Sequence, residues 1–255
     1  MQLLFFQSDT TLIFALCIGY ISIAGLITWI FIKENNRLFF QKYEGVVAPF
    51  FSLPAVLFSL TVALLATSVW DNYSISTKAI KNETQGILDV ISIASSTPYM
   101  DKVDVAASAK AYAQSVIDDE WQTLASNRSP SSTTNDKFIK LRTDIFKAVN
   151  IASDKAESKA LLNAFYTVNN ARESRLAYAF FDLHPVRWHA LLFLGILLLI
   201  TVAFTHSSKP RALIVAMLIA TPTILTPLCI LALTFSSPYQ GLIAISNSPF
   251  LQITQ

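Results

Sequence analysis

Long apolar runs alternate with polar stretches along the chain, and their lengths predict four membrane-spanning helices. The runs cover about residues 11–32, 48–69, 189–205 and 212–235. A helix needs roughly 20 apolar residues to cross about 30 Å of hydrocarbon, and each run approaches or exceeds that length. We therefore expect an integral membrane protein in which two spans, a polar insert and two more spans follow one another.

The insert, about residues 70–187, has the pattern of helices throughout. Between Ala55 and Thr97 there is no proline and only one glycine, Gly86, so the second span is expected to continue into the insert without a break. Beyond the span, apolar and small residues recur at spacings of four and three, which predicts a coiled-coil-like seam. The seam consists of Tyr73, Thr77, Ile80, Thr84, Ile87, Ile91 and Ala94.

The rest of the insert predicts three further helices, near residues 101–125, 135–150 and 154–182, separated by stretches rich in proline, serine and threonine. The expected fold class is an all-α membrane protein. Its four transmembrane helices have a two-plus-two arrangement, with a helical soluble insert between spans 2 and 3. The expected domains are 1–69, the first transmembrane pair; 70–187, the insert; and 188–255, the second pair with the C-terminal tail.

The orientation in the membrane follows from the lysines and arginines of the short loops. The basic residues are Lys33, Arg37 and Lys42 in the first loop and Lys209 and Arg211 in the second, and both tails have none. By the positive-inside rule the short loops are cytoplasmic, and both termini and the insert lie outside. In a bacterial inner membrane the insert is then periplasmic. Lys78, Lys81 and Arg187 lie close to the membrane and favour the opposite orientation.

The overall composition agrees with a membrane protein. Hydrophobic residues make up 53% of the chain and charged residues 14%, against about 25% charged residues in soluble domains. The net charge is only +2 and the basic residues are dispersed, so nucleic acid is not an expected partner. Cys17 and Cys229 both lie inside predicted spans, and they indicate neither a disulfide framework nor a metal site.

One set of charged residues in the insert is predicted to meet across two helices. If the first and last insert helices are antiparallel, Trp70 and Arg187 both mark the membrane surface, and equal rise places Glu83 level with position 174. Arg172 and Arg175 flank that level. A carboxylate facing guanidinium groups at a helix seam can form a bidentate ion pair that sets the register of the helices. The alternative is a site that binds an anion or another ligand.

The remaining polar residues give no support to an enzyme. Asp118, Asp119 and Glu120 are consecutive, so on a helix their side chains point in different directions, and we interpret them as a solvated acidic turn rather than a metal site. The sequence has no HExxH motif, no glycine-rich phosphate loop and no arrangement of a catalytic triad. We expect no catalytic residues, no metal and no cofactor.

Span 2 carries two helical stripes that bear on a possible pore. Phe51, Phe58 and Leu65 recur every seven residues on one face, and Ser52 and Ser59 belong to a second face of small residues. Small faces allow helices to approach closely, whereas hydrophobic and aromatic constrictions can gate a pore by dewetting. These five residues are therefore candidates for the pore lining, with helix packing as the alternative. No ionisable residue lies well inside a span, which disfavours a proton relay.

Short motifs spread over nearly the whole chain resemble those of the bestrophin-like family of bacterial and plant membrane proteins. The matching pieces are Trp70-x-x-Tyr73, Glu83, Tyr112, Glu120-Trp121, Arg172-x-x-Arg175-Leu176, Trp188 and Ser237-Pro238-Tyr239-Gln240-Gly241. The resemblance implies a two-plus-two arrangement similar to that of bestrophins, which are pentameric ion channels whose pore is lined by the second span. It implies no catalytic or ligand-binding residues.

Two hypotheses of function follow. The first is a homo-oligomeric ion channel lined by span 2, whose partners are the lipid bilayer, further copies of the chain and ions. The second is a membrane-anchored interaction or sensing module that uses the helical insert and conducts nothing. Bestrophins place their large insert in the cytosol, whereas the loop charges of this chain place it outside. Either the relation is one of architecture only, or the charge rule fails in this chain.

Overall fold

The computed structural model describes residues 9–42, 52–96, 103–126, 129–152, 154–179, 185–234, 239 and 244–254. Within these ranges every regular element is a helix, which confirms the all-α prediction for the described part of the chain. The chain divides into two compact units. Unit 1 comprises Met1–Val69 and Asp182–Ser236, and unit 2 comprises Trp70–Phe181 and Ser237–Gln255.

Among the residues that the structure describes, four helices are long and apolar enough to span a membrane, as the apolar runs predict. They are α1 (Asp9–Ile32), the first part of α4 (Ser52–Ser96), α9 (Pro185–Thr205) and α10 (Pro210–Thr234). The protein is therefore an integral membrane protein by the length and composition of its helices. A short amphipathic helix, α2 (Glu34–Gln41), follows α1 in the first loop.

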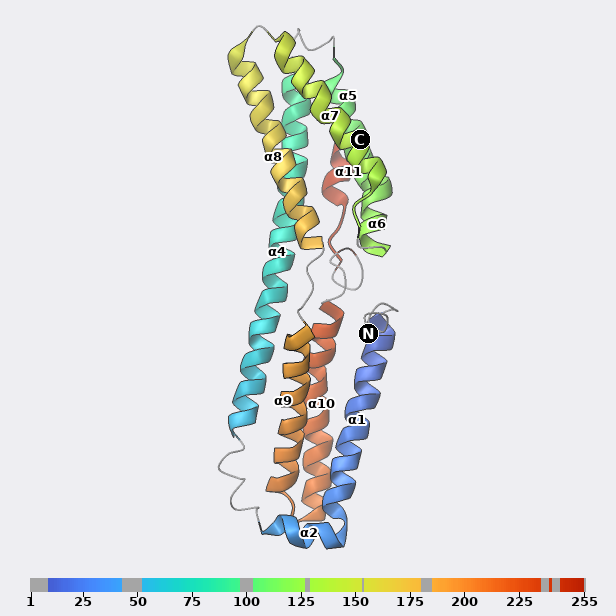
Figure 1. The fold of residues 1–255 in the computed structure, drawn as a ribbon, viewed down its shortest axis with the longest axis vertical. Coiled ribbons are helices and arrows are strands. Elements are labelled where there is room, and N and C mark those ends of the chain that lie inside the picture. The colour runs from blue at the N-terminus through green and yellow to red at the C-terminus, as the bar shows by residue number, and fades with distance from the viewer. Residues whose placement is uncertain are drawn as a thin grey trace. The chain divides into compact units, whose positions relative to one another are not determined.

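Unit 1 has an almost entirely apolar interior. Helices α1, α9 and α10 run side by side, as Figure 1 shows, and aliphatic side chains fill the space between them. The Tyr20 hydroxyl donates a hydrogen bond to the Leu192 carbonyl at 2.7 Å, which joins α1 to α9. Phe31 of α1 and Phe40 of α2 stack with ring centroids 4.1 Å apart, and Phe204 meets both rings edge-on. These contacts hold α2 against the ends of α1 and α9.

Unit 2 consists of shorter helices packed around the second part of α4 (Figure 1). They are α5 (Val105–Ser115), the π-helix η3 (Val116–Glu120), α6 (Trp121–Ser126), α7 (Ser132–Ile151), α8 (Lys155–Ala179) and α11 (Ser248–Thr254). Side chains cap two of them. The Asp104 carboxylate accepts from the Ala107 amide at the start of α5, and the Ser131 hydroxyl accepts from the Thr134 amide at the start of α7. Such caps satisfy amides that have no partner inside a helix.

Helix α4 is continuous over 45 residues, which confirms that span 2 runs into the insert without a break. Along its second part the predicted seam is buried or half-buried, while Lys78 and Lys81 on the other side are exposed. At Gly86 the helix lies very close to α8. A Cβ added to Gly86 would lie 2.9 Å from Cγ2 of Val168 and 3.3 Å from the carbonyl oxygen of Ala164, so only glycine fits without a shift of backbone.

The C-terminal segment belongs to unit 2, although it follows the last span in the sequence. Ile245, Phe250 and Ile253 are buried in the same apolar core as α5 and α7. Trp121 packs edge-on against both Tyr239 and Phe250. The sequence predicts only a tail here and not this packing, because a seven-residue helix is too short to show a clear period.

Candidate functional site

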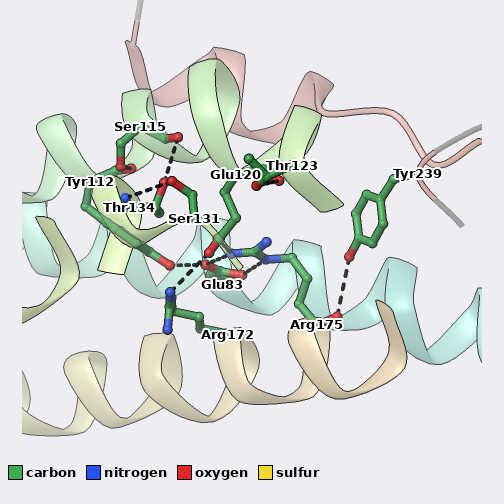
Figure 2. A network of polar contacts seen from close by, with 10 residues as sticks. All are labelled: Glu83, Tyr112, Ser115, Glu120, Thr123, Ser131, Thr134, Arg172, Arg175 and Tyr239. Atoms are coloured by element: carbon green, nitrogen blue, oxygen red, sulfur yellow. Dashed lines mark hydrogen bonds and ion pairs between the residues drawn. The ribbon is translucent and has the colours of Figure 1, made fainter. Parts of the chain in front are cut away.

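Two carboxylates and two guanidinium groups meet in the interior of unit 2, as Figure 2 shows. Glu83 comes from α4, Glu120 from η3, and Arg172 and Arg175 from α8. The exposed fractions are 0%, 0%, 7% and 0%, in that order. Charged side chains are rarely buried to this degree unless they are paired. We refer to these four residues as the buried ion network.

Arg175 lies at the centre of the buried ion network. Its Nε donates to Oε2 of Glu83 at 2.6 Å, and its Nη2 donates to Oε1 of Glu83 at 3.1 Å, so the pair is bidentate. The same Nη2 donates to Oε2 of Glu120 at 2.6 Å. One guanidinium therefore joins α4 and η3 to α8. The structure thus brings together Glu83 and Arg175, two of the three residues of the predicted clamp.

The third predicted residue, Arg172, takes a different partner. Its Nη2 donates to Oε1 of Glu120 at 3.1 Å, and no direct bond to Glu83 is present among the described contacts. The guanidinium also lies over the ring of Phe138, 4.8 Å from the centroid, at a distance typical of a cation–π contact. Arg172 therefore joins α8 to η3 and α7 rather than to α4.

The interpretation of Glu120 as part of a solvated acidic turn is wrong. Asp118 is exposed, but Glu120 is fully buried and bonds to both arginines. A signal for this was present in the sequence. Val116 and Leu124 lie four residues before and after Glu120, and both belong to the buried face, so Glu120 continues the inward stripe of its helix.

The π-helix explains how Glu120 reaches the same side as Tyr112. In a regular α-helix, two positions eight apart differ by roughly 80° around the axis. In η3 the amide of Trp121 bonds to the carbonyl of Val116, an i→i+5 bond that takes one more residue per turn. The eight positions from Tyr112 to Glu120 then cover the same rotation as seven positions of a regular α-helix. The directions of the two side chains around the axis therefore differ by only roughly 20°. Nothing in the sequence marks this irregular turn.

Two tyrosines complete the network. The Tyr112 hydroxyl donates to Oε1 of Glu83 at 2.5 Å, and the Tyr239 hydroxyl donates to the backbone carbonyl of Arg175 at 3.4 Å (Figure 2). The Arg175 guanidinium also lies over Phe250, 5.8 Å from the ring centroid. Tyr239 and Phe250 of the C-terminal segment therefore both lie beside Arg175.

The environment shifts the protonation of these groups. Burial, with the Glu83 carboxylate as the next cause, raises the pKa of Tyr112 well above its usual value of 10. Burial also raises the pKa of Tyr239 to about 12. Burial alone would lower the pKa of Arg175, but Glu83 and Glu120 more than offset this, and the pKa stays well above its usual value. Arg175 therefore keeps its charge and both phenols keep their protons at neutral pH.

The chemistry of the arrangement favours a structural ion-pair cluster over a reactive site. Two carboxylates oppose two guanidinium groups, so the charges of the cluster balance. Every carboxylate oxygen accepts at least one hydrogen bond from a side chain of the network. Such a set of opposite charges fixes one arrangement of helices, because removal of Arg175 leaves Glu83, and removal of Glu120 leaves Arg172, as a buried charge without its ion-pair partner.

The pore-lining candidates of span 2 lie on different sides of α4. Phe58 and Leu65 are 6% and 5% exposed and pack into the apolar core of unit 1. Ser52 and Ser59 are exposed. Phe51 lies outside the described residues. The structure therefore separates Phe58 and Leu65, which pack into the core of unit 1, from Ser52 and Ser59, which are exposed.

Comparison with known protein families gives one match that covers most of the chain. A family model described as Bestrophin-like domain matches residues 18–250. Seven residues from the short motifs that carry the resemblance meet in or directly beside the buried ion network. They are Glu83, Tyr112, Glu120, Trp121, Arg172, Arg175 and Tyr239. A search of curated proteins gives no significant match.

Proposed function

Because the chain belongs to the Bestrophin-like domain family, we propose that it is a homo-oligomeric membrane channel in which α4 lines a central passage for ions. One observation carries this proposal. A single unbroken helix, Ser52–Ser96, contains both the second span and Glu83 of the buried ion network. A change in the packing of unit 2 can therefore act directly on the helix that forms the passage.

In this proposal the spans have a two-plus-two arrangement around a helical insert outside the membrane. The face of α4 that offers a lining is the exposed small-residue face, with Ser52, Ser59 and Ala63. Only 11% of the most apolar stretch of α4, and 11% of that of α1, is buried within one chain, against 33% for α9 and α10. Most of the span part of α4 is thus open to lipid or to neighbouring copies, as a ring of subunits requires.

Flux through vesicles tests the proposal. We expect purified protein in lipid vesicles to conduct small inorganic ions, and Ser59→Trp to reduce the flux at least tenfold, because a large ring would fill the passage. The matched control is Leu60→Trp, the next residue, which is 55% exposed and points in another direction. Phe58→Ala, in the packed core, should lower stability and leave the flux per assembled oligomer unchanged.

The absence of flux from vesicles that contain correctly assembled wild-type protein would exclude the channel. A flux that Leu60→Trp and Ser59→Trp reduce equally would show that the small-residue face is not the lining. A rise in flux with Phe58→Ala would instead assign the lining to the aromatic stripe.

The second candidate function is a membrane-anchored interaction or sensing module. The observation that favours it is the burial of Phe58 and Leu65 within one chain, which removes the most pore-like stripe of span 2 from a passage. The stoichiometry in detergent separates the two candidates, since a channel needs a ring with a continuous axis, whereas the module functions as a monomer or dimer.

We further propose that the protein lies in a bacterial inner membrane with its insert in the periplasm, on the basis of the loop charges. In a variant with both native cysteines replaced by serine, a single cysteine at the exposed position Ser129 should react with an impermeant thiol reagent in intact cells. A cysteine at the exposed position Asn35, in the first loop, should be protected. The reverse pattern would place the insert in the cytosol, as in bestrophins.

A further inference from the structure

The chain has two cysteines, and the structure places them in contact. Cys17 lies on α1 and Cys229 on α10, and they are 212 residues apart in the sequence. Their Sγ atoms are 3.8 Å apart, and both are free thiols with partial exposure. With so few cysteines in a chain of 255 residues, this contact between the first and last spans is a distinct feature of unit 1.

The surrounding helices hold the two thiols toward each other. Three residues after Cys17, the Tyr20 hydroxyl bonds to the Leu192 carbonyl and fits against Gly195 of α9. Ile224 of α10 meets the same point: a Cβ added to Gly195 would lie 2.5 Å from the Tyr20 oxygen and 3.1 Å from Ile224 Cγ2. This close packing of α1, α9 and α10 fixes the register in which the cysteines face each other.

We propose that Cys17 and Cys229 form a reversible disulfide that ties α1 to α10, with a lipid-soluble quinone as the oxidant. Both S–H bonds break and one S–S bond forms. The two protons and two electrons pass to the quinone, which becomes the quinol. A disulfide is about 2.0 Å long, so the sulfur atoms must approach by roughly 1.8 Å, which side-chain rotation and a small shift of the helices supply.

The position of the pair fits this class of oxidant. Both cysteines lie within apolar helices that are long enough to span a membrane, and thiol–disulfide exchange requires direct access of the attacking partner. Cys17 lies four residues after the start of its span and Cys229 three residues before the end of its span, so both thiols lie near one end of the apolar helices, within reach of an oxidant dissolved in the lipid. A quinone dissolves in the same hydrocarbon and accepts two electrons and two protons. The tie therefore responds to the redox state of the membrane, and it does so whether or not the protein conducts ions.

The experiment uses the full-length protein in lipid vesicles with a fully substituted, short-chain ubiquinone, which accepts electrons but does not add thiols. We expect peptide mass spectrometry to show one Cys17–Cys229 linkage with the loss of two hydrogens. The product should migrate as a monomer on a non-reducing gel, and dithiothreitol should reverse the linkage. We expect the melting temperature to rise by roughly 5 °C on oxidation, because the tie restricts the unfolded chain.

Two controls test whether the contact governs the reaction. Cys17→Ser and Cys229→Ser should each abolish the linkage within the chain. The combined change Cys17→Ser and Ile18→Cys moves the thiol to a side chain that is 65% exposed and off the α10 side, and we expect linkage at least tenfold more slowly. Unreacted thiols in the wild type, linkage only between copies, or an equal rate in the relocated variant would each overturn the proposal.

Discussion

Unit 1 and unit 2 are both helical, yet their interiors are held together by different forces. Among the residues whose burial is described, the interior of unit 1 contains no charged side chain. The interior of unit 2 contains all four members of the buried ion network. In unit 1 the hydroxyls of Thr28, Thr201 and Thr221 donate back to the carbonyl one turn earlier in their own helix.

The difference shows how each unit specifies one arrangement of helices. In unit 1 these threonine hydroxyls satisfy backbone groups within their own helix. Apart from the bond between Tyr20 and Leu192, close packing, as at Gly195, therefore has to select the neighbours of each helix. In unit 2 the polar groups join different helices, and the positions of the charges select the register. A substitution that removes a polar partner should therefore lower the stability of unit 2 more than that of unit 1. A substitution that only changes the shape of a side chain should have comparable effects on the two units.

The largest expected effect is the loss of Arg175. Arg175→Leu leaves the carboxylates of Glu83 and Glu120 buried without their shared partner, and we expect a loss of about 3 to 5 kcal/mol in the stability of unit 2. Amide hydrogen exchange resolved by peptide should show the loss in α5 and α8 and leave α9 unchanged. The control Arg142→Leu removes an exposed arginine of α7 and should change little. Equal effects of the two changes would show that the network contributes nothing specific.

The sequence predicts some structural features of the two units and not others. The four spans follow from run length alone, because lipid sets the required length. The continuity of α4 follows from the absence of proline between Ala55 and Thr97. The docking of the C-terminal segment could not be predicted, since α11 has seven residues and its partners in α5 and η3 lie more than 100 positions away.

For the buried ion network, equal rise along antiparallel helices predicts the level of Glu83 and Arg175, because that geometry depends only on sequence spacing. The partner of Arg172 could not be found in this way. It depends on η3, where one i→i+5 turn rotates Glu120 inward, and on the detailed path of α7 near Phe138. The inward position of Glu120 could have been predicted, because Val116 and Leu124 lie four residues before and after it. The run of three acidic residues obscures this spacing.

Two glycines, one in each unit, test how closely the helices pack. Gly86→Ala in unit 2 brings a methyl group against the backbone of α8, and Gly195→Ala in unit 1 brings one against the Tyr20 hydroxyl. We expect losses of about 1 to 3 kcal/mol at both sites, with the larger at Gly86 because backbone yields less than a side chain. Gly25→Ala is the control, since nothing lies within 4 Å of its added Cβ. A neutral Gly86→Ala would contradict the close approach of α4 and α8.

Removal of one hydroxyl in each unit compares the same chemical change. Tyr112→Phe removes a bond to the ionised Glu83, and we expect a loss of about 1.5 to 3 kcal/mol. Tyr20→Phe removes a bond to a neutral carbonyl within the membrane unit, where such bonds contribute about 0.6 kcal/mol on average. Local hydrogen exchange in α5 and α9 measures the two losses separately. A larger loss of stability in Tyr20→Phe than in Tyr112→Phe would contradict the view that apolar packing, rather than polar contacts, holds unit 1 together.

A further expected effect is a loss of unit 2 stability at alkaline pH. Because burial raises the pKa of Tyr239 from 10 in the unfolded chain to about 12 in the folded protein, the folded state holds this proton more tightly. The contribution to stability is complete below pH 10 and is lost as the pH rises from 10 to about 12, at about 1.4 kcal/mol per pH unit. Melting temperatures between pH 8 and pH 11 should therefore fall less steeply in Tyr239→Phe than in the wild type. Tyr166→Phe, at a side chain that is 52% exposed, should retain the wild-type slope, and parallel slopes in all three proteins would show that the Tyr239 phenol is in contact with solvent.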